Sequence, residues 1–523
     1  MRTSLHHLLE TGARSAGDAS AITYREVTRS YGELWARARQ VAGGLAELGL
    51  ERGDRVAVFL EKRVETVESL FGISAAGGVL VPINPLLRAS QVAYILGDCD
   101  VRVLVTTSER LELLAGVLED CPRLEHVIVV GDVAREPGDG TASRQRWTDV
   151  VDGAAELVPR RSIDLDIAAI LYTSGSTGMP KGVVLSHRNL VVGGESVSHY
   201  LGNVSDDVIL AALPLSFDAG FSQLTTGFNV GAHVVLMNYL LPNDVVRLCK
   251  RHGVTGLTCV PPLWIQIANQ EWPEDVGETV RYFANTGGRM PRTTLDRLRS
   301  VFPRARPFLM YGLTEAFRST YLDPAEVDRR PDSIGKAIPD AEILVVRPDG
   351  TRCDPGEEGE LVHRGALVAL GYWNDPERTA ERFRTAPGHD ADWRATSEVA
   401  VWSGDTVVAD EEGFLYFVGR ADEMIKTSGY RVSPTEVEEA AYATGLVRDA
   451  VALGVDDPVL GQRVALVVAM TSEEEPSADG LMARLKRDLP TYMVPSVLEV
   501  RDELPRSPNG KFDRALLRQE IRP

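Results

Sequence analysis

The sequence predicts an α/β fold: a large N-terminal domain of layered parallel sheets with helices, a distorted β-barrel segment, and a small mobile α+β domain at the C-terminus. Up to residue 315, apolar stretches of strand length alternate with stretches of helical spacing. This alternation is typical of parallel sheets covered by helices on both faces. From residue 343 short strands and turns replace it, which indicates an antiparallel or barrel-like segment. The expected domains are residues 1–421 and 422–523.

The elements are predicted from periodicity and from the residues that end each stretch. Residues 5–49 are expected to be largely helical, ending at Gly49, and 134–145 form an exposed loop. Further helices are expected at 64–76, 91–96, 189–200, 263–269, 434–443 and 479–488. Strands are expected at 55–60, 77–82, 101–106, 127–130, 167–171, 183–185, 232–237, 256–260, 282–288, 307–315, 343–347, 359–364, 400–402, 414–418, 424–426, 450–455 and 464–470.

The composition is that of an ordinary globular protein, with 44% hydrophobic and 25% charged residues in a chain of 523. A net charge of −19 argues against nucleic acid or an anionic membrane as a partner. The five cysteines lack CxxC spacing, which favours reduced thiols over a disulfide framework or a zinc site. Without a signal peptide or a run of about 18 apolar residues, a cytoplasmic protein with no membrane insertion is expected.

The stretch from Leu171 to His187, LYTSGSTGMPKGVVLSH, runs from an apolar strand into a loop of glycines and hydroxyls. Glycines expose backbone N–H groups, and hydroxyls and a lysine add donors, so the loop predicts a phosphate cradle. The Walker pattern does not fit, because Pro180 precedes Lys181 and Gly182 follows it. A Gly/Ser-rich surface turn is the plain alternative. The candidate phosphate ligands are Thr173, Ser174, Gly175, Ser176, Thr177, Gly178 and Lys181.

Two later strand ends add candidate nucleotide contacts, since ligands bind beyond the carboxyl ends of strands in open α/β sheets. Gly287 and Gly288, followed by Arg289, offer a flat backbone surface for a purine, and Tyr311-Gly312 offers an opposing aromatic face. Alone, each is a turn or a core aromatic. With the loop above and the motif YGLTE at 311–315, however, the chain resembles the adenylate-forming superfamily of acyl-CoA synthetases, peptide-synthetase adenylation domains and luciferases.

This resemblance implies roles for further residues along the whole chain. It implies that Thr314 contacts the α-phosphate and that Glu315 holds Mg²⁺, a cation that prefers oxygen ligands. Asp405 is implied to grip the ribose hydroxyls, with Phe417 beside the ribose and Arg420 on ribose or phosphate. On its own, Asp405 would be a solvated turn residue.

The resemblance also implies a mobile C-terminal domain that serves two reaction steps. Lys511 would bridge the carboxylate and phosphate oxygens during adenylation, where preorganised cations stabilise the developing charge. Asp422 matches the hinge. Rotation would then bring the face around Lys426 to the acyl-adenylate, with Gly429 lining the path of a thiol. Without the family, Lys511 in Asn-Gly-Lys would be an exposed turn lysine.

Phe217, Asp218, Gly312 and Arg318 are the candidate substrate-pocket residues. Asp218 matches the position where amino-acid-adenylating domains bind the substrate ammonium, and a carboxylate in an apolar pocket is costly without a cation. The alternative is that Asp218 caps the following helix. Arg318 either pairs with a second carboxylate of the substrate or with Asp218.

The sequence therefore predicts an AMP-forming ligase that uses ATP and Mg²⁺ to activate a small carboxylic acid, an amino acid or another amine-bearing acid being favoured by Asp218. The acyl group is expected to pass to CoA or to a carrier protein in trans, because no carrier segment follows Asp513. The chain most resembles stand-alone acyl-CoA ligases found with exosortase-type clusters. The alternatives are a stand-alone amino-acid adenylation enzyme, an enzyme that stops at the adenylate or oxidises it, and a non-catalytic nucleotide-binding protein.

Overall fold

The computed structural model describes residues 2–131, 142–173, 180–388, 398–420, 424–471, 478–505 and 512–521. Its nine-stranded sheet is mainly parallel and has the order β16 (Lys336–Ala337), β15 (Thr320–Leu322), β14 (Arg306–Tyr311), β13 (Tyr282–Asn285), β12 (Gly256–Cys259), β10 (Val208–Ala211), β11 (His233–Leu236), β1 (Ser20–Tyr24), β2 (Val27–Ser30). An eight-stranded sheet has the order β19 (Gly371–Tyr372), β9 (Lys181–Ser186), β8 (Ile167–Thr173), β4 (Val79–Pro82), β3 (Arg55–Phe59), β5 (Val101–Thr107), β6 (His126–Val130), β7 (Ser143–Arg146).

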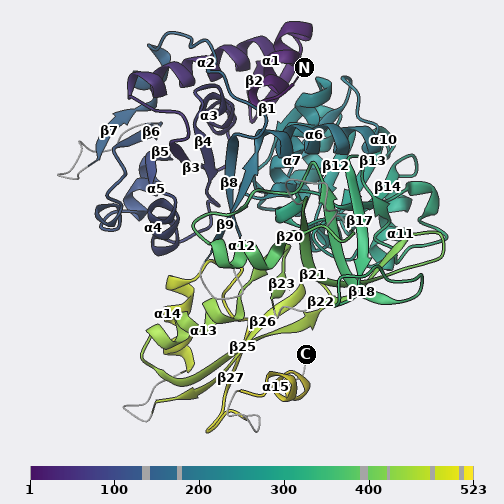
Figure 1. Ribbon diagram of the computed structural model, residues 1–523. Coiled ribbons are helices and arrows are strands. Elements are labelled where there is room, and N and C mark those ends of the chain that lie inside the picture. Colours follow the sequence, from purple (N-terminus) through teal and green to yellow (C-terminus); the bar gives the residue numbers. More distant parts are fainter. Residues whose placement is uncertain are drawn as a thin grey trace.

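Helices and the two sheets form a layered N-terminal domain (Figure 1). The largest apolar core joins the inner faces of both sheets to α1 (His6–Ala16), α2 (Tyr31–Glu47), α3 (Val64–Ala75), α6 (His187–Leu201) and α7 (Asp218–Val230). The outer face of the nine-stranded sheet packs on α8 (Pro242–His252), α9 (Pro261–Ala268), α10 (Glu274–Thr279) and α11 (Arg292–Val301). The outer face of the eight-stranded sheet packs on α4 (Ala89–Asp98) and α5 (Ser108–Leu113). Short helical turns are η1 (Leu118–Asp120), η2 (Thr148–Asp152), η3 (Thr314–Ala316) and η4 (Pro324–Glu326).

A third, antiparallel sheet follows, and then the small α+β domain, drawn in yellow-green below the rest in Figure 1. The third sheet contains β17 (Ala341–Val346), β18 (Glu358–Gly365), β21 (Val399–Ala409), β20 (Phe383–Thr385) and β22 (Leu415–Arg420), beside α12 (Pro376–Arg382). The small domain contains β23 (Ile425–Thr427), β24 (Tyr430–Val432), β25 (Val447–Asp457), β26 (Gly461–Met470) and β27 (Val497–Val500), with α13 (Pro434–Ala443), α14 (Ala478–Asp488) and α15 (Arg514–Glu520).

The predicted fold class is confirmed, but several local predictions are wrong. The strands predicted to run to residues 288 and 315 end at Asn285 and Tyr311. Residues 20–30, expected inside a helical stretch, form the β1–β2 hairpin, because β1 extends the nine-stranded sheet beside β11. Arg25 turns that hairpin with a φ of 55°, and the helix α2 begins only after Ser30, whose side chain caps it. Residues 143–145, expected in a loop, belong to the edge strand β7.

The five cysteines are free, and four of them are buried. Within the described ranges no helix is long and apolar enough to cross a membrane.

Candidate active site

A cleft of about 1380 Å³ opens at the carboxyl ends of strands from both large sheets and is closed on one side by the small domain. Most described residues predicted for the site line it, namely Thr173, Phe217, Asp218, Gly287, Gly288, Arg289, Tyr311, Gly312, Thr314, Asp405, Phe417, Lys426 and Gly429. Lys181, Glu315 and Arg318 lie behind this surface. Ser174, Gly175, Ser176, Thr177, Gly178, Asp422 and Lys511 lie outside the described residues, as does the side chain of Arg420.

The predicted purine and ribose contacts lie together at one end of the cleft. Gly287 has a φ of 76°, and Asn285 Nδ2 donates to the Gly288 carbonyl at 2.7 Å, which fixes this turn. The Tyr311 hydroxyl donates to Asp405, and the rings of Tyr311 and Phe417 lie 6.4 Å apart. These contacts form a shallow aromatic wall beside a carboxylate, a surface suited to a nucleoside.

Arg289 and Arg420 flank this end of the cleft. Arg289 forms an exposed ion pair with Asp332 at 2.5 Å. The backbone of Arg420 ends β22 in register with Asp405. The backbone of Arg420 therefore stands beside the predicted ribose contact, and Arg289 lines the cleft.

Glu315 is buried behind the phosphate side of the cleft. Its Oε1 accepts from Lys181 Nζ at 2.9 Å and from the Tyr372 hydroxyl at 2.7 Å, while its buried Oε2 has no partner among the described residues. Burial alone would raise the pKa of Glu315, but Lys181 and Arg431 outweigh burial and hold it well below its ordinary value. The carboxylate is therefore charged, and among the described residues nothing occupies its second oxygen.

The predicted substrate carboxylate, Asp218, is already paired. Arg318 donates to Asp218 Oδ2 at 2.6 Å, and Thr314 lies 3.4 Å from Oδ1. Of the two roles predicted for Arg318, the pair with Asp218 is the one observed. The predicted helix cap is not, since α7 has Phe217 at its N-cap and no side-chain cap hydrogen bond.

Residues around Gly429 of the small domain meet the large domain inside the cleft. A Cβ on Gly429 would lie 2.8 Å from Val260, so this backbone packs against the large domain without room for a side chain. The Tyr430 ring contacts Phe217 edge-to-face at 5.4 Å and stacks on Tyr492 at 3.9 Å.

Two further polar contacts join the domains. Arg88 donates to the carbonyls of Lys486 and Leu489 at the end of α14. Gln91 donates to Glu436 at 2.8 Å. The start of α4 thus holds the small domain in this position.

The sequence profile described as AMP-binding enzyme matches residues 9–373, and that of the AMP-binding enzyme C-terminal domain matches residues 436–511. The chain belongs to the AMP-binding enzyme family. It is 30% identical to a long-chain-fatty-acid–CoA ligase of Escherichia coli O157:H7, covering 99% of this chain and 95% of the relative. It is also 30% identical to an L-proline–[L-prolyl-carrier protein] ligase of Pseudomonas fluorescens, covering 96% of each chain.

Among solved structures, the chain resembles o-succinylbenzoate CoA synthetase of Bacillus subtilis at 26% identity and 98% coverage of both chains. The TM-score is 0.84 against the complex with the product analogue OSB-NCoA and 0.69 against the complex with the adenylate OSB-AMP. These comparisons confirm the predicted superfamily and the predicted class of activity, an AMP-forming acid–thiol ligase that depends on ATP.

The sequence interpretation of this AMP-binding enzyme missed several cleft residues, among them Lys62. Lys62, in the loop after β3, is buried, and its Nζ donates to the carbonyls of Ala211, Ala212 and Leu213 at 3.0, 2.7 and 3.0 Å. Burial lowers the pKa of Lys62 to about 7. The lysine thus connects the eight-stranded sheet to the end of β10 in the nine-stranded sheet. Residues 214–218, which line the acid side of the cleft, follow directly after these carbonyls. A lone lysine after an apolar strand gives no pattern from which this could be inferred.

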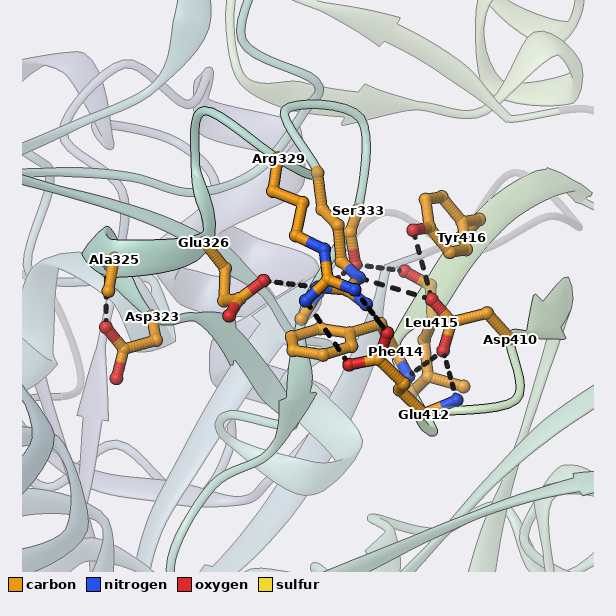
Figure 2. Close-up of polar contacts among 12 residues, drawn as sticks. Asp323, Ala325, Glu326, Arg329, Ser333, Asp410, Glu412, Phe414, Leu415 and Tyr416 are labelled. Carbon is orange, nitrogen blue, oxygen red and sulfur yellow. Dashed lines mark hydrogen bonds and ion pairs between the residues drawn. The ribbon is translucent and has the colours of Figure 1, made fainter.

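A second group of polar contacts joins residues after η4 to the β21–β22 hairpin (Figure 2). Arg330 is 7% exposed and pairs with Glu326, Asp410 and Glu412, while its guanidinium lies 4.0 Å from the centre of the Phe414 ring. Ser333 donates to the Leu415 carbonyl at 2.8 Å. The segment after η4, which lines the cleft at residues 331–334, is thereby fixed to the β21–β22 hairpin.

Proposed function

We propose that the protein joins a small carboxylic acid to ATP, forming an acyl-adenylate and pyrophosphate, and then passes the acyl group to a thiol with release of AMP. In the first step an acid oxygen bonds to the α-phosphorus and the bond to the β-phosphate oxygen breaks. In the second step the thiol sulfur, after losing its proton, replaces AMP at the acyl carbon. The observation that carries the proposal is the single cleft that joins the predicted nucleotide contacts, Asp218 and the small-domain residues around Gly429.

The nucleotide contacts are assigned from the resemblance to the adenylate-forming superfamily. We assign the purine to Gly287, Gly288, Arg289 and Tyr311, and the ribose to Asp405, Phe417 and Arg420. We assign the phosphates to the loop 173–181 and Thr314. The hydrogen bond from Tyr311 to Asp405 supports this, because it places the aromatic face and the carboxylate side by side.

Glu315 fits a Mg²⁺ ion, since its buried Oε2 has no partner among the described residues and carboxylate oxygen is a preferred ligand. No group of three or more His, Cys, Asp or Glu side chains in the described ranges could hold a metal, so phosphate oxygens would supply other ligands. When bound, the ion would neutralise charge on the phosphates. We assign Lys511 to the charge that develops on the carboxylate and α-phosphate during adenylation.

The described position of the small domain supports an arrangement for the thiol step. Gly429 packs on Val260 and Tyr430 on Phe217, so these residues face the acid side of the cleft. The higher TM-score against the CoA product analogue complex than against the adenylate complex of the same synthetase favours this interpretation. We therefore propose domains at 1–421 and 422–523, with the hinge at Asp422 and the thiol path along Lys426 and Gly429.

An amino-acid adenylation enzyme that loads a carrier protein is the second candidate. The carboxylate of Asp218 and the likeness to a prolyl-carrier protein ligase favour it. The pair between Arg318 and Asp218 weighs against an ammonium at this position. The acceptor is CoA or the phosphopantetheine of a carrier protein. The protein is proposed to act in the cytoplasm, because its five cysteines are free thiols.

The test is ATP–pyrophosphate exchange with a panel of amino, hydroxy, aryl, dicarboxylic and fatty acids, followed by thioester formation with CoA and with carrier proteins. We expect acid-dependent exchange that Lys511→Ala abolishes. Exchange that survives Lys511→Ala would refute the assigned role. Adenylate without any thioester would refute the second step, and absence of nucleotide binding would refute the whole proposal.

A further inference from the structure

The acid side of the cleft contains a carboxylate whose charge is already balanced. Asp218 lines the cleft with a side chain that is 16% exposed, whereas Arg318 behind it is 2% exposed. The contact from Arg318 to Oδ2 of Asp218 measures 2.6 Å. The hydroxyl of Thr314, which also lines the cleft, donates to the opposite oxygen, Oδ1, at 3.4 Å.

The backbone holds Arg318 in this place. Phe317 has a φ of 56° and a ψ of −48°, and Arg318 N donates to the Ala316 carbonyl at 2.5 Å. This is a γ-turn with positive φ, a rare and strained form that persists only when its surroundings fix it. Arg318 also donates to the Phe317 carbonyl at 2.9 Å, and its Cα lies 3.1 Å from the place of a Cβ on Gly312.

Arg318 has little other compensation for its buried charge. Its Nε has no hydrogen-bond partner among the described residues. Removing a buried guanidinium from its carboxylate would leave both charges uncompensated, so the pair is expected to persist when substrate binds. The pair therefore presents to the cleft a hydrogen-bond acceptor with almost no net charge.

We propose that the acid carries a neutral hydrogen-bond donor, such as a hydroxyl or an amide N–H, next to its carboxyl group, and not an ammonium. This inference rests on the proposed function, because Thr314 is there assigned to the α-phosphate and Asp218 thus faces the carbon beside the activated carboxyl. An ammonium would meet Arg318 just behind the carboxylate, and like charges disfavour each other at such distances. A hydroxyl donates to Oδ1 without that cost. Arg318 is then a positioning residue that selects through Asp218.

The test uses three non-hydrolysable 5′-O-(N-acylsulfamoyl)adenosines that share one acyl skeleton and carry a hydrogen, a hydroxyl or an amino group at the α-carbon. Calorimetry with the full-length protein at pH 7 gives the three dissociation constants without requiring turnover. We expect the hydroxyl compound to bind about tenfold more tightly than the amino compound. In Arg318→Met we expect the order to reverse, since Asp218 is then free to bind the ammonium.

A pH series separates this role from a merely structural one. Affinity of the wild-type protein for the amino compound should rise as pH passes about 8, where an α-amino group loses its proton, and affinity for the hydroxyl compound should stay constant. Arg318→Gln keeps a hydrogen-bond donor but no charge, and it tests the same role if Arg318→Met does not fold. Arg281→Met is the matched control, because Arg281 pairs with buried Asp207 at 2.7 Å away from the cleft.

Two outcomes would overturn the inference: tighter binding of the amino compound by the wild-type protein, or the same order of affinities in wild type and both Arg318 variants. Pyrophosphate exchange distinguishes failure of the proposed function from failure of this inference. The predicted order of affinities without pyrophosphate exchange for any acid would refute adenylation and leave the selectivity of the pocket established.

Discussion

Lys181 Nζ lies 2.9 Å from Oε1 of Glu315, and both side chains are nearly buried, at 10% and 4% exposed. Lys181→Met leaves the buried carboxylate of Glu315 short of a cation. We expect the free energy of unfolding to fall by about 3 kcal/mol, the lower range for breaking a buried pair, because Arg431 also acts on Glu315. Urea denaturation measures the loss.

The exposed Lys250 at the end of α8 provides the control, and Lys250→Met should change the stability by less than about 0.5 kcal/mol. Glu315→Gln added to Lys181→Met should restore part of the loss, since no buried charge then remains. A double variant less stable than Lys181→Met would contradict the ion-pair explanation.

Gly429→Ala should separate the two half-reactions. The residue has a φ of 81°, and an added Cβ would lie 2.8 Å from Val260 of the large domain. We expect thioester formation to fall by about tenfold or more, because strain and collision together disfavour the described domain position. Pyrophosphate exchange should stay within about twofold of wild type, since that step is assigned to another position of the small domain.

Gly445→Ala is the matched control for Gly429→Ala. Gly445 has a φ of 69°, and nothing lies within 4 Å of an added Cβ. It therefore carries similar backbone strain without the collision. Equal losses of thioester formation in the two variants would show that strain alone is responsible.

The cleft was predictable from sequence where strand ends carry small, hydroxylated or charged residues. The glycines at 287–288 and residues 311–314 of the YGLTE motif line the cleft as expected, because parallel strands bring their carboxyl ends to one edge. The sequence left open whether Arg318 pairs with Asp218 or with a second carboxylate of the substrate. It depends on the strained turn at Phe317, and no local pattern indicates that a phenylalanine adopts positive φ.

The missed features depend on partners distant in sequence. Lys62 bonds to carbonyls around residue 212, and no periodicity links the two. The hairpin at 20–30 forms because β11, two hundred residues later, offers an edge for pairing. Tertiary pairing here overrides the local helical spacing.

Lys62→Met should weaken the acid side of the cleft. Three donated hydrogen bonds to the end of β10 are lost, and their carbonyls lie in a buried region. We expect the KM for the acid in pyrophosphate exchange to rise several-fold, with a smaller change in the KM for ATP, because residues 213–218 follow these carbonyls. In Lys62→Gln, which retains an amide donor, the KM for the acid should lie between the values of the wild type and Lys62→Met. Equal changes in both KM values would contradict this local role.

Arg330→Met should lower the thermal midpoint more than Arg329→Met. Arg330 is 7% exposed and pairs with three carboxylates, whereas Arg329 is 63% exposed and pairs with Glu412 at 2.7 Å (Figure 2). Exposed pairs contribute little, so Arg329→Met should stay within about 1 °C of wild type. We also expect a raised KM for ATP in Arg330→Met alone, as the cleft residues 331–334 lose their support. Similar midpoints for the two variants would contradict the difference in burial.

Acid should destabilise the protein through buried histidines at the N-terminal helix. His6 Nδ1 lies 3.1 Å from Ser74 Oγ, and His187 Nδ1 accepts from Leu5 N at 3.2 Å. Burial lowers the pKa of His6 to about 3 and that of His187 to about 4, from 6.5. The unfolded chain therefore binds protons first as pH falls below about 6.5, and stability declines by about 1.4 kcal/mol per pH unit for each histidine.

His6→Phe removes one of these protonations while keeping a ring on Trp35, on which His6 stacks. At pH 7 the variant is expected to be less stable, because the contact with Ser74 is lost. Its unfolding free energy should then fall less steeply than that of wild type between pH 6 and pH 4. The difference in stability between the two proteins should therefore become smaller as pH falls. Urea denaturation across this range gives both slopes, with the exposed His199→Phe as the control. Parallel slopes for wild type and His6→Phe would show that His6 is not among the groups through which acid acts.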